Sequence, residues 1–462
     1  MIFMNTVLNK VDFLFSIDKD NDELLVTQIY QKVKEEILNG TMKYGDVLPS
    51  IRKASASLGV SKITVITAYL QLVTEGYIEN RPQRGYFVCK VERKPNEPSL
   101  LEWEFREQNI SFVNDSIDEQ SFSKSLWKKY YNRVLFDPET DLTHIGDEQG
   151  EYALRSAISN YVRMHRGSNC TPEQVIISSG VQSLVDLLIK LTQSNFNSAV
   201  LESPGYKKVE YVFEDARIPI HKIPVGENGL NIQDIHPINH ALIYVSPGYQ
   251  YPLGKVMTID KRLELIQYAK ENSCLIIEDD YASTIRYEAK PISSLQGLDG
   301  FGNTVYIGSF SKTFLPSLRI SFMVLPKKLV KKYFSIKAKY THQSSKLEQL
   351  ALAQFIFDGQ MEKHLKRINK IYKQKNLFIS SYIKQNYANQ LKIINNESGF
   401  HMVFRCHTQK DQSVVQDFHN ELLSFEIIDL SDGVMTFLFN YSGLTLEEIP
   451  WIIDTMVQIL NL

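Results

Sequence analysis

Short apolar runs of strand character alternate with helical runs from Asn109 onward, and this alternation constrains the fold more than any other feature of the chain. Four of these runs are Gln174–Ser178, Ser198–Leu201, Ala241–Val245 and Cys274–Ile277. Strands that alternate with helices usually pair in parallel, because the helix returns the chain to the same edge of the sheet. The sequence therefore predicts an α/β domain with a mostly parallel central sheet. We expect a site at the carboxyl ends of its strands, where each run gives way to polar, Gly or Pro residues.

A hydroxyl-rich turn with one lysine follows a further apolar run, Val305–Ile307. The turn contains Ser309, Ser311 and Lys312, and Arg319 comes seven residues after the lysine. A partly desolvated lysine amine condenses with an aldehyde, and the planar fork of an arginine grips a phosphate at two points. The turn thus predicts an amine beside a phosphate site. The alternative is a surface lysine in a serine-rich turn, since short motifs match often.

Three consecutive carboxylates, Glu278, Asp279 and Asp280, stand with Tyr281 at the end of a buried run. Burying them is costly unless a cation or a hydrogen-bond donor lies there, and a protonated pyridine nitrogen would serve. The alternatives are a divalent metal ion or a solvated strand end. The sequence offers no histidine or further acidic cluster that completes a metal shell, so it favours the organic cation.

A glycine turn, Ser179-Gly180-Val181-Gln182, separates the strand Gln174–Ser178 from a helix predicted over Leu184–Thr192. Such a turn aims backbone N–H groups at a phosphate. The amine, the arginine with this turn, the carboxylate and the tyrosines together describe a pocket for pyridoxal 5′-phosphate.

The first ninety residues have a different pattern, in which helices precede a hairpin. Leu24–Gly40 has apolar residues at helical spacing, and Pro49 and Ser50 open a second helix that Gly59 closes. Ser61 is a natural N-cap for a third helix. The apolar positions predicted to share one side of it are Ile63, Ile66, Ala68, Tyr69, Leu70 and Val73. The second and third helices predict a helix-turn-helix with the later helix placed for a major groove.

The exposed face of this third helix has short polar or basic groups, which suit phosphates and base edges. These groups are Ser61, Lys62, Thr64 and Thr67. Tyr77–Val88 reads as strand, turn and strand with Arg81, Arg84 and Gly85 at the tip, a wing for the minor groove. The alternative is a small helical domain with a solvated polar face.

Residues 24 to about 89 closely resemble the winged helix-turn-helix domain of GntR-family repressors and activators. The matching residues are Leu48-Pro49-Ser50-Ile51-Arg52, Leu58-Gly59-Val60-Ser61, Thr64-Val65, Ala68-Tyr69, Leu72, Glu75-Gly76-Tyr77 and Arg84-Gly85. The resemblance implies contacts with double-stranded operator DNA near Ser50, Arg52, Ser61, Lys62, Thr64, Thr67, Arg84 and Gly85. We expect this domain over residues 1–89 and a charged linker with Pro95 and Pro98 over residues 90–108.

The overall charge gives no sign of a nucleic-acid or membrane partner, because 51 Lys and Arg balance 53 Asp and Glu among 462 residues. A basic surface must therefore be local. The four cysteines are widely spaced, as in a protein with reduced thiols. Without a signal-peptide pattern or an apolar run of about 18 residues, we expect a cytoplasmic protein.

The larger region, which we assign to residues 109–462, resembles a type I aminotransferase. The matching residues are Gly146-Asp147, Gly150, Leu154-Arg155, Ala157-Ile158, Tyr161, Arg166-Gly167, Cys170, Pro172-Glu173-Gln174, Glu202-x-Pro204-Gly205-Tyr206, Pro252-x-Gly254, Glu278-Asp279-Asp280-Tyr281, Ser309-x-Ser311-Lys312 and Arg319. A winged helix ahead of this fold is the arrangement of the MocR subgroup of GntR regulators. The chain is similar to the branch that senses pyridoxal phosphate and regulates vitamin B6 synthesis.

The resemblance implies a role for each matching site residue. Lys312 would form a Schiff base with the cofactor, Asp279 would pair with the pyridine nitrogen, and Tyr281 would bond the ring hydroxyl with Gln250 nearby. Tyr206 would line the ring face. The phosphate would be held by Gly180, Val181, Gln182, Ser309, Ser311 and Arg319. The family also implies a homodimer, domain-swapped head to tail, in which the DNA domain of one chain packs on the large domain of the other.

Three functions remain open on the sequence. Enzymes of this fold hold a substrate carboxylate with an arginine near the C-terminus, but the corresponding stretch here, Tyr441-Ser442-Gly443-Leu444, has glycine at that place. Lys207-Lys208 likewise replaces an arginine after Tyr206. We therefore favour a regulator whose effector is pyridoxal phosphate itself, with no catalytic residues. The alternatives are a sensor of an amino acid or amine through an external aldimine, and a working aminotransferase.

Overall fold

The computed structural model describes residues 13, 15–19, 23–91, 116–192, 195–235, 237–287, 292–340, 344–395, 398–410, 414 and 425–462. They fall into two compact units, within residues 1–105 and 106–462. Beyond Val91, the linker predicted over residues 90–108 lies outside the described part of the chain.

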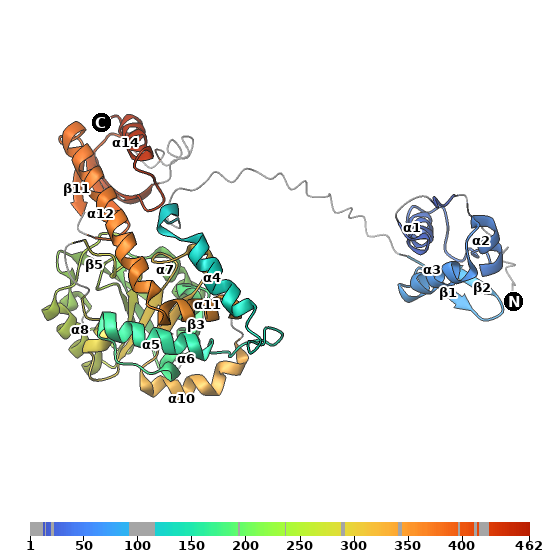
Figure 1. Cartoon of the computed structure of the whole chain (residues 1–462), viewed down its shortest axis with the longest axis horizontal. Helices are drawn as coiled ribbons and strands as arrows, with labels where there is room; N and C mark the ends of the chain where they lie inside the picture. Colours follow the sequence, from blue (N-terminus) through green and yellow to red (C-terminus); the bar gives the residue numbers. More distant parts are fainter. Residues whose placement is uncertain are drawn as a thin grey trace. The chain divides into compact units, whose positions relative to one another are not determined.

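The smaller unit is a three-helix domain with a two-stranded wing (Figure 1). Its elements are α1 (Leu25–Leu38), α2 (Ile51–Leu58), α3 (Lys62–Thr74), β1 (Ile78–Arg81) and β2 (Gly85–Val88). Gly59 ends α2 in the left-handed region, with φ 64°, and Ser61 caps α3 through the N–H of Thr64. These two residues make the tight turn of the helix-turn-helix, as the sequence predicts.

The prediction for the buried side of α3 is partly wrong. Val65, Ala68, Tyr69 and Leu72 face the core, whereas Ile63, Ile66 and Leu70 lie outside and are 75%, 36% and 56% exposed. Residues 65, 68, 69 and 72 already form a complete helical stripe, so the remaining apolar residues have no core to face. The outward face of α3 is therefore more apolar than expected.

The larger unit confirms the predicted α/β class. Its central sheet has the order β3-β10-β9-β8-β7-β4-β5-β6, with parallel pairing from β9 through β5 and antiparallel strands at both edges. The strands are β3 (Val175–Ser178), β4 (Ser198–Ser203), β5 (Ile220–Gly226), β6 (Gly229–Leu230), β7 (Ala241–Val245), β8 (Leu275–Asp280), β9 (Thr304–Ser309) and β10 (Ser321–Val324).

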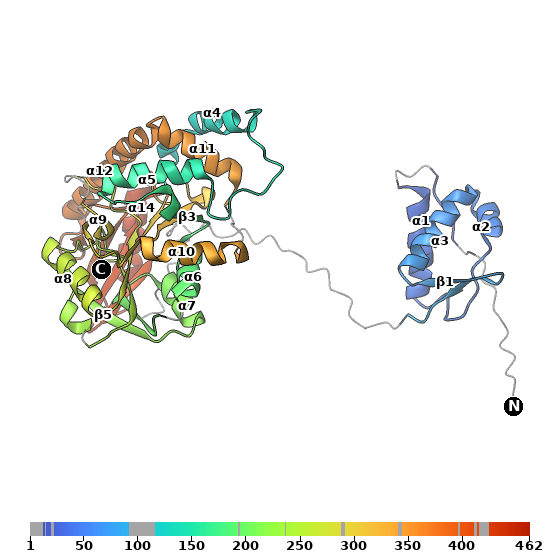
Figure 2. The ribbon, with the colours of Figure 1, turned by 90° about the horizontal axis from the view of Figure 1, so that it is seen from below.

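Helices cover both faces of this sheet (Figure 2). Alternate residues of each strand pack on opposite layers. One layer contains α6 (Val181–Thr192), α7 (Lys207–Asp215) and α10 (Lys327–Ile336). The other contains α5 (Tyr152–Arg166), α8 (Ile259–Glu271) and α11 (Lys346–Phe357), and α4 (Lys124–Leu135) packs on α11. The short α9 (Leu295–Leu298) precedes β9.

A second, antiparallel sheet has the order β11-β12-β14-β13. Its strands are β11 (Lys392–Asn395), β12 (His401–His407), β13 (Glu426–Ser431) and β14 (Val434–Asn440). The helices α12 (Gln360–Asn386) and α14 (Glu448–Leu460) precede and follow them in the chain. Apolar residues of α12 and α14 pack on one face of this sheet. Within the described ranges no single helix is long and apolar enough to cross a membrane, and the bent pair α2 and α3 meets that test by length and composition only.

Candidate functional site

The lysine turn lies directly after β9 and is fixed from several sides. The hydroxyl of Ser309 accepts hydrogen bonds from the N–H of Ser311 at 3.2 Å and from the hydroxyl of Ser321 at 3.0 Å. Nε2 of His364 donates to the carbonyl oxygen of Thr313, the residue after Lys312, at 2.8 Å. These bonds hold the turn that carries Lys312 in one conformation.

Arg319 and Gly180, far apart in sequence, lie against each other. A Cβ built on Gly180 would stand 2.9 Å from Nη2 of Arg319, so a glycine there leaves the room that the guanidinium takes. Arg319 itself is held in the left-handed region, with φ 50° and ψ 46°. Helix α6 begins at Val181, three residues earlier than predicted, and its first N–H groups therefore lie beside this guanidinium. The two predicted phosphate elements thus meet at one place.

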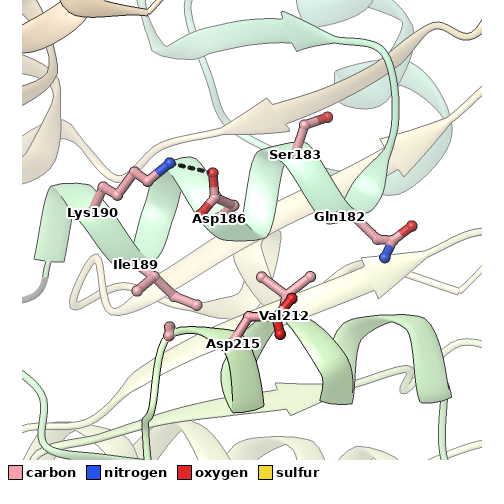
Figure 3. A pocket seen from close by; sticks show the side chains of 8 residues that line it. Gln182, Ser183, Asp186, Ile189, Lys190, Val212 and Asp215 are labelled. Atoms are coloured by element: carbon pink, nitrogen blue, oxygen red, sulfur yellow. Dashed lines mark hydrogen bonds and ion pairs between the residues drawn. The ribbon is translucent and has the colours of Figure 1, made fainter. Parts of the chain in front are cut away.

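Gln182 directs its side chain elsewhere. Its amide nitrogen donates to the carbonyl oxygen of Lys208 at 3.0 Å, and the side chain lines a groove of about 480 Å³ between α6 and α7 (Figure 3). Asp186, Lys190 and Asp215 line the same groove, where Asp186 and Lys190 pair at 2.6 Å. Only the backbone of Gln182 is therefore available beside Gly180.

Strand β8 separates the three carboxylates by the alternation of its side chains. Glu278 accepts hydrogen bonds from the N–H groups of Leu295 and Gln296 at 2.8 and 3.0 Å, which caps α9. Asp280 pairs with Nε of the buried Arg166 at 2.6 Å and accepts from Tyr306 at 2.6 Å. Both carboxylates therefore find their partners on the side of the sheet that contains α5.

Asp279 points to the opposite layer, the one that contains α6. Tyr244 donates a hydrogen bond to its Oδ2, while Oδ1 is buried with no hydrogen-bond partner among the described residues. Burial raises the pKa of Asp279 to about 7, and the charges of Asp280 and Glu278 add to the rise while Tyr244 opposes it. An unsatisfied buried acceptor of this kind favours a cationic or hydrogen-donating group beside it.

Aromatic side chains gather next to Asp279. The ring centroid of Tyr281 lies 5.9 Å from those of Tyr249 and Tyr251, and Tyr206 lies 5.8 Å from Tyr251. The hydroxyl of Tyr281 is buried and, in the part of the chain described, has no hydrogen-bond partner. The cluster thus offers ring faces together with one unused phenol.

His401, from β12, completes this cluster at 5.8 Å from the ring of Tyr251. Burial lowers the pKa of His401 to about 4; its bond to the carbonyl of Pro252 opposes the shift, and the nearby charge of Lys312 adds to it. The imidazole is therefore neutral beside the lysine at ordinary pH. This contact also shows that the second sheet contributes to the site.

Gln250 holds the loops that carry the tyrosines. Its amide nitrogen donates to the carbonyl oxygens of Pro204, at 2.8 Å, and of Tyr251, and its amide oxygen accepts from the N–H of Leu253 at 3.1 Å. Because these bonds use the amide internally, Gln250 supports the positions of Tyr206 and Tyr251.

The glycine at the expected place of the clamp arginine is tightly packed. A Cβ on Gly443 would stand 2.2 Å from Oγ of Ser116, and the hydroxyl of Ser442 donates to the carbonyl oxygen of Ser116 at 2.7 Å. Arg405, the last arginine of the chain, is exposed on β12 and donates to Thr436. Lys207, which follows Tyr206 in place of an arginine, pairs with Glu210 at 3.1 Å.

The residues predicted to contact DNA lie on one helix-turn-helix and its wing. Ser50 and Ser61 cap α2 and α3, accepting from the N–H groups of Lys53 at 3.3 Å and Thr64 at 3.1 Å. The exposed side chains of the set are Ser50, Arg52, Ser61, Lys62, Thr67 and Arg84, while Thr64 is half-buried. At the wing tip Gly85 has φ 106°, and Arg81 is paired with Glu79 and stacks on Phe87, so Arg84 is the tip arginine that extends outward.

Four site residues escaped prediction from the sequence: Tyr244, Tyr249, Tyr251 and His401. Tyr244 carries a signal that could have found it, because a tyrosine inside an otherwise apolar buried strand needs a partner for its hydroxyl. Tyr249 and Tyr251 flank the predicted Gln250 and could have been included with it. His401 has no local signal, since its place depends on how the second sheet packs.

Two family models match the chain: aminotransferase class I and II over residues 118–429, and bacterial regulatory proteins of the gntR family over residues 25–88. The chain is 37% identical to the uncharacterized HTH-type transcriptional regulator YdeL of Bacillus subtilis (strain 168), over 84% of this chain and 85% of that protein. It is 32% identical to the probable rhizopine catabolism regulatory protein MocR of Rhizobium meliloti, over 84% and 83%. It is 27% identical to the HTH-type pyridoxine biosynthesis transcriptional regulator PdxR of Corynebacterium glutamicum, over 87% of each.

Among solved structures, an archaeal alanine:glyoxylate aminotransferase superposes with a TM-score of 0.69 at 21% identity, covering 76% of this chain and 90% of that one. LysN, an α-aminoadipate aminotransferase from Thermus thermophilus, superposes with a TM-score of 0.68 at 20% identity, covering 77% and 93%. At such identities the likeness concerns the fold alone.

Proposed function

The chain belongs to the MocR subgroup of GntR-family transcriptional regulators, and from this membership we propose that it binds pyridoxal 5′-phosphate at Lys312 and uses this cofactor as its effector. Its targets on this proposal are genes for pyridoxal phosphate synthesis, and it acts in the cytoplasm, where it reaches chromosomal DNA. The relative PdxR, named for the regulation of pyridoxine biosynthesis, supports this choice of target.

The observation that carries the proposal is the orphaned oxygen of Asp279. Oδ1 is buried without a partner among the described residues, and so is the hydroxyl of Tyr281 beside it. A protonated pyridine nitrogen and a ring hydroxyl are the two polar groups of pyridoxal phosphate that would satisfy them. The residues present therefore fit the cofactor.

Each remaining part of the cofactor also has a chemical match. Arg319, the backbone of Gly180, Val181 and Gln182, and the hydroxyls of Ser309 and Ser311 would hold the phosphate. Tyr206 would cover the ring, and Gln250 would support the loops around it. Pyridoxal phosphate supplies an aldehyde, which the amine of Lys312 would capture.

The aminotransferase-like region serves, on this proposal, as a sensor without turnover. Gly443 packs against Ser116 in the stretch where an enzyme would have its carboxylate-binding arginine. A lost orienting contact weakens both binding and chemistry. Steady transfer from an amino donor to a keto acid by the purified protein would contradict this part.

We expect the regulator to act as a homodimer, with two winged domains over two half-sites. The described segment between α4 and α5 exposes large apolar side chains that a partner subunit could cover, including Phe136 at 76% and Ile145 at 86% exposed. This surface supports a partner subunit, and sedimentation of the purified protein tests it.

The test of the effector is a comparison with and without pyridoxal phosphate. With pyridoxal phosphate, the native protein should gain an absorbance band near the edge of the visible range and change its affinity for promoter DNA. After borohydride reduction, the cofactor should stay covalently attached to the protein. Lys312→Ala should lose all three responses, while Lys327→Ala, at an exposed lysine of α10, should keep them. Equal DNA affinity in the native protein with and without the cofactor would defeat the effector role.

A second candidate, an amine sensor, is favoured by one contact. Tyr251, in the aromatic cluster, donates a hydrogen bond to Glu426 of β13, which brings a carboxylate to this end of the site. A carboxylate there favours a cationic amine over an amino acid, whose own carboxylate it repels. Titration of amines against the loaded protein separates the candidates, because only an amine sensor should change its absorbance and its DNA affinity together.

A further inference from the structure

The outward face of α3 carries an apolar stripe. Ile63, Ile66 and Leu70 recur at helical spacing and are 75%, 36% and 56% exposed. The opposite face, with Val65, is buried in the core of the domain. Within the smaller unit, these isoleucines and the leucine are not needed to hold the helix in place.

The polar groups of the same face are largely engaged within the helix. The hydroxyls of Ser61 and Thr64 bond each other at 2.8 Å, and Ser61 also accepts from the N–H of Thr64 at 3.1 Å. Thr67 donates its hydroxyl hydrogen to the carbonyl oxygen of Ile63 at 3.0 Å. The hydroxyls predicted to read base edges thus have few donors left for bases.

The surroundings of the stripe favour a polyanion. From Val47 to Thr74 the sequence contains no Asp or Glu. The basic side chains Arg52, Lys53 and Lys62 of the same stretch are exposed. Such a charge pattern attracts the DNA backbone, and the first turns of the second helix of a helix-turn-helix enter the major groove.

We infer that Ile63 and Ile66 select thymines in the operator by contact with their 5-methyl groups. The thymine methyl is the one apolar group that a base pair presents in the major groove, and an aliphatic side chain recognises it by excluding water. Leu70, one turn further along α3, lies beyond the part of the helix that enters the groove. This inference rests on the proposed DNA-binding function and adds a sequence preference to it.

The test uses the full-length protein and duplexes selected from a random pool. Each thymine of the selected site is replaced in turn by deoxyuridine, which removes the methyl group and keeps the pairing edges. At one or two positions in each half-site the affinity should fall about fourfold, the loss expected for one buried methyl group. Ile63→Ala or Ile66→Ala should abolish this difference between thymine and uracil at its own position.

Leu70→Ala is the matched control, because it shortens the same stripe outside the groove and should leave the thymine preference unchanged. All three substitutions place alanine at exposed helical positions, where it favours the helix, so the domain should stay folded. The inference would be overturned if deoxyuridine left the affinity unchanged at every position. It would also be overturned if both isoleucine variants kept the full preference for thymine over uracil. Failure to bind any duplex would instead overturn the DNA-binding function, and this inference with it.

Discussion

Tyr244 donates its phenol hydrogen to Oδ2 of Asp279, and this bond leaves the other carboxylate oxygen, Oδ1, buried without a partner among the described residues. The bond therefore stabilises the ionised carboxylate at one of its two oxygens, while burial of the side chain disfavours ionisation. A cationic group of a ligand would stabilise the ionised form at Oδ1, so ligand binding and the ionisation of Asp279 should be coupled.

Asp279→Asn should make the ligand-free protein less sensitive to pH. Burial raises the pKa of Asp279 to about 7, so the folded protein holds a proton that the unfolded chain releases near pH 4. The free energy of unfolding should consequently fall as pH rises from about 4 to about 7, by at most a few kcal/mol from this group. Urea unfolding of both proteins across that range measures the difference.

The comparison with the native protein is needed because burial also raises the pKa of Glu278 to about 7 and that of Glu202 to about 8. Both groups are present in the native protein and in the variant, so most of their contribution to the slope cancels. The pKa of Glu202 should fall somewhat in the variant, because the charge of Asp279 contributes to its rise. The variant should also bind pyridoxal phosphate more weakly, since a neutral amide oxygen lacks the negative charge that strengthens the hydrogen bond from a protonated nitrogen. Identical pH slopes would contradict the buried carboxylate.

The residue pattern alone indicated that carboxylates end β8, and only the family resemblance singled out Asp279 as the one for the ring nitrogen. That choice depends on the alternation of the strand between two helical layers, and on Arg166 and the first turn of α9, which engage Asp280 and Glu278 from one layer. Arg166 is distant in sequence, and its partner could not be predicted from spacing. The lysine turn was easier to predict, because a strand end, small residues and the lysine are all local.

Gly180→Ala should weaken pyridoxal phosphate binding about tenfold without unfolding the protein. The added Cβ would stand 2.9 Å from Nη2 of Arg319, so the guanidinium must move away from α6. A displaced charge-assisted hydrogen bond costs about 1.5 kcal/mol. Absorbance titration measures the affinity. Gly300→Ala is the control, because nothing lies within 4 Å of a Cβ at that exposed turn and binding should be unchanged.

The winged domain shows the same limit of local patterns. Helix boundaries and caps followed from the sequence, because Gly59 and Ser61 act on their own neighbours. The buried side of α3 did not, since apolar residues occur on both of its faces and only packing decides which stripe is covered. An apolar residue at helical spacing is thus weak evidence for burial in a helix that contacts a ligand.

His364→Phe should loosen the lysine turn. The imidazole donates from Nε2 to the buried carbonyl of Thr313 at 2.8 Å, and a phenyl ring leaves that oxygen unsatisfied at a cost of about 1–3 kcal/mol. Cofactor affinity and thermal stability should both fall. His364→Gln, which keeps a donor, should recover part of both losses.

The contribution of His364 to cofactor affinity should not change between pH 6 and 8. Burial lowers the pKa of His364 to about 4, with the charge of Arg367 adding to the shift and the bond to Thr313 opposing it, so the ring stays neutral over that range. Below about pH 6.5 the unfolded chain binds a proton at His364 that the folded protein does not bind. The contribution of His364 to the free energy of unfolding should therefore diminish as the pH falls. An affinity difference that varies strongly between pH 6 and 8 would argue against the neutral donor.

Gly443→Ala should destabilise the protein by about 1–3 kcal/mol, because its Cβ would stand 2.2 Å from Oγ and 2.8 Å from Cβ of Ser116. The loss should be recovered largely by Ser116→Gly in the same chain, since that substitution removes both atoms. Ser116→Gly alone should lower the free energy of unfolding less than Gly443→Ala does, because the hydroxyl of Ser442 donates to the main-chain oxygen of residue 116, which the substitution keeps. Denaturant unfolding of the four proteins gives the coupling, and additive effects would refute the contact. The same crowding predicts that Gly443→Arg cannot install a carboxylate clamp unless Ser116 is also replaced, so the glycine at this position and the packing of the segment form one structural feature.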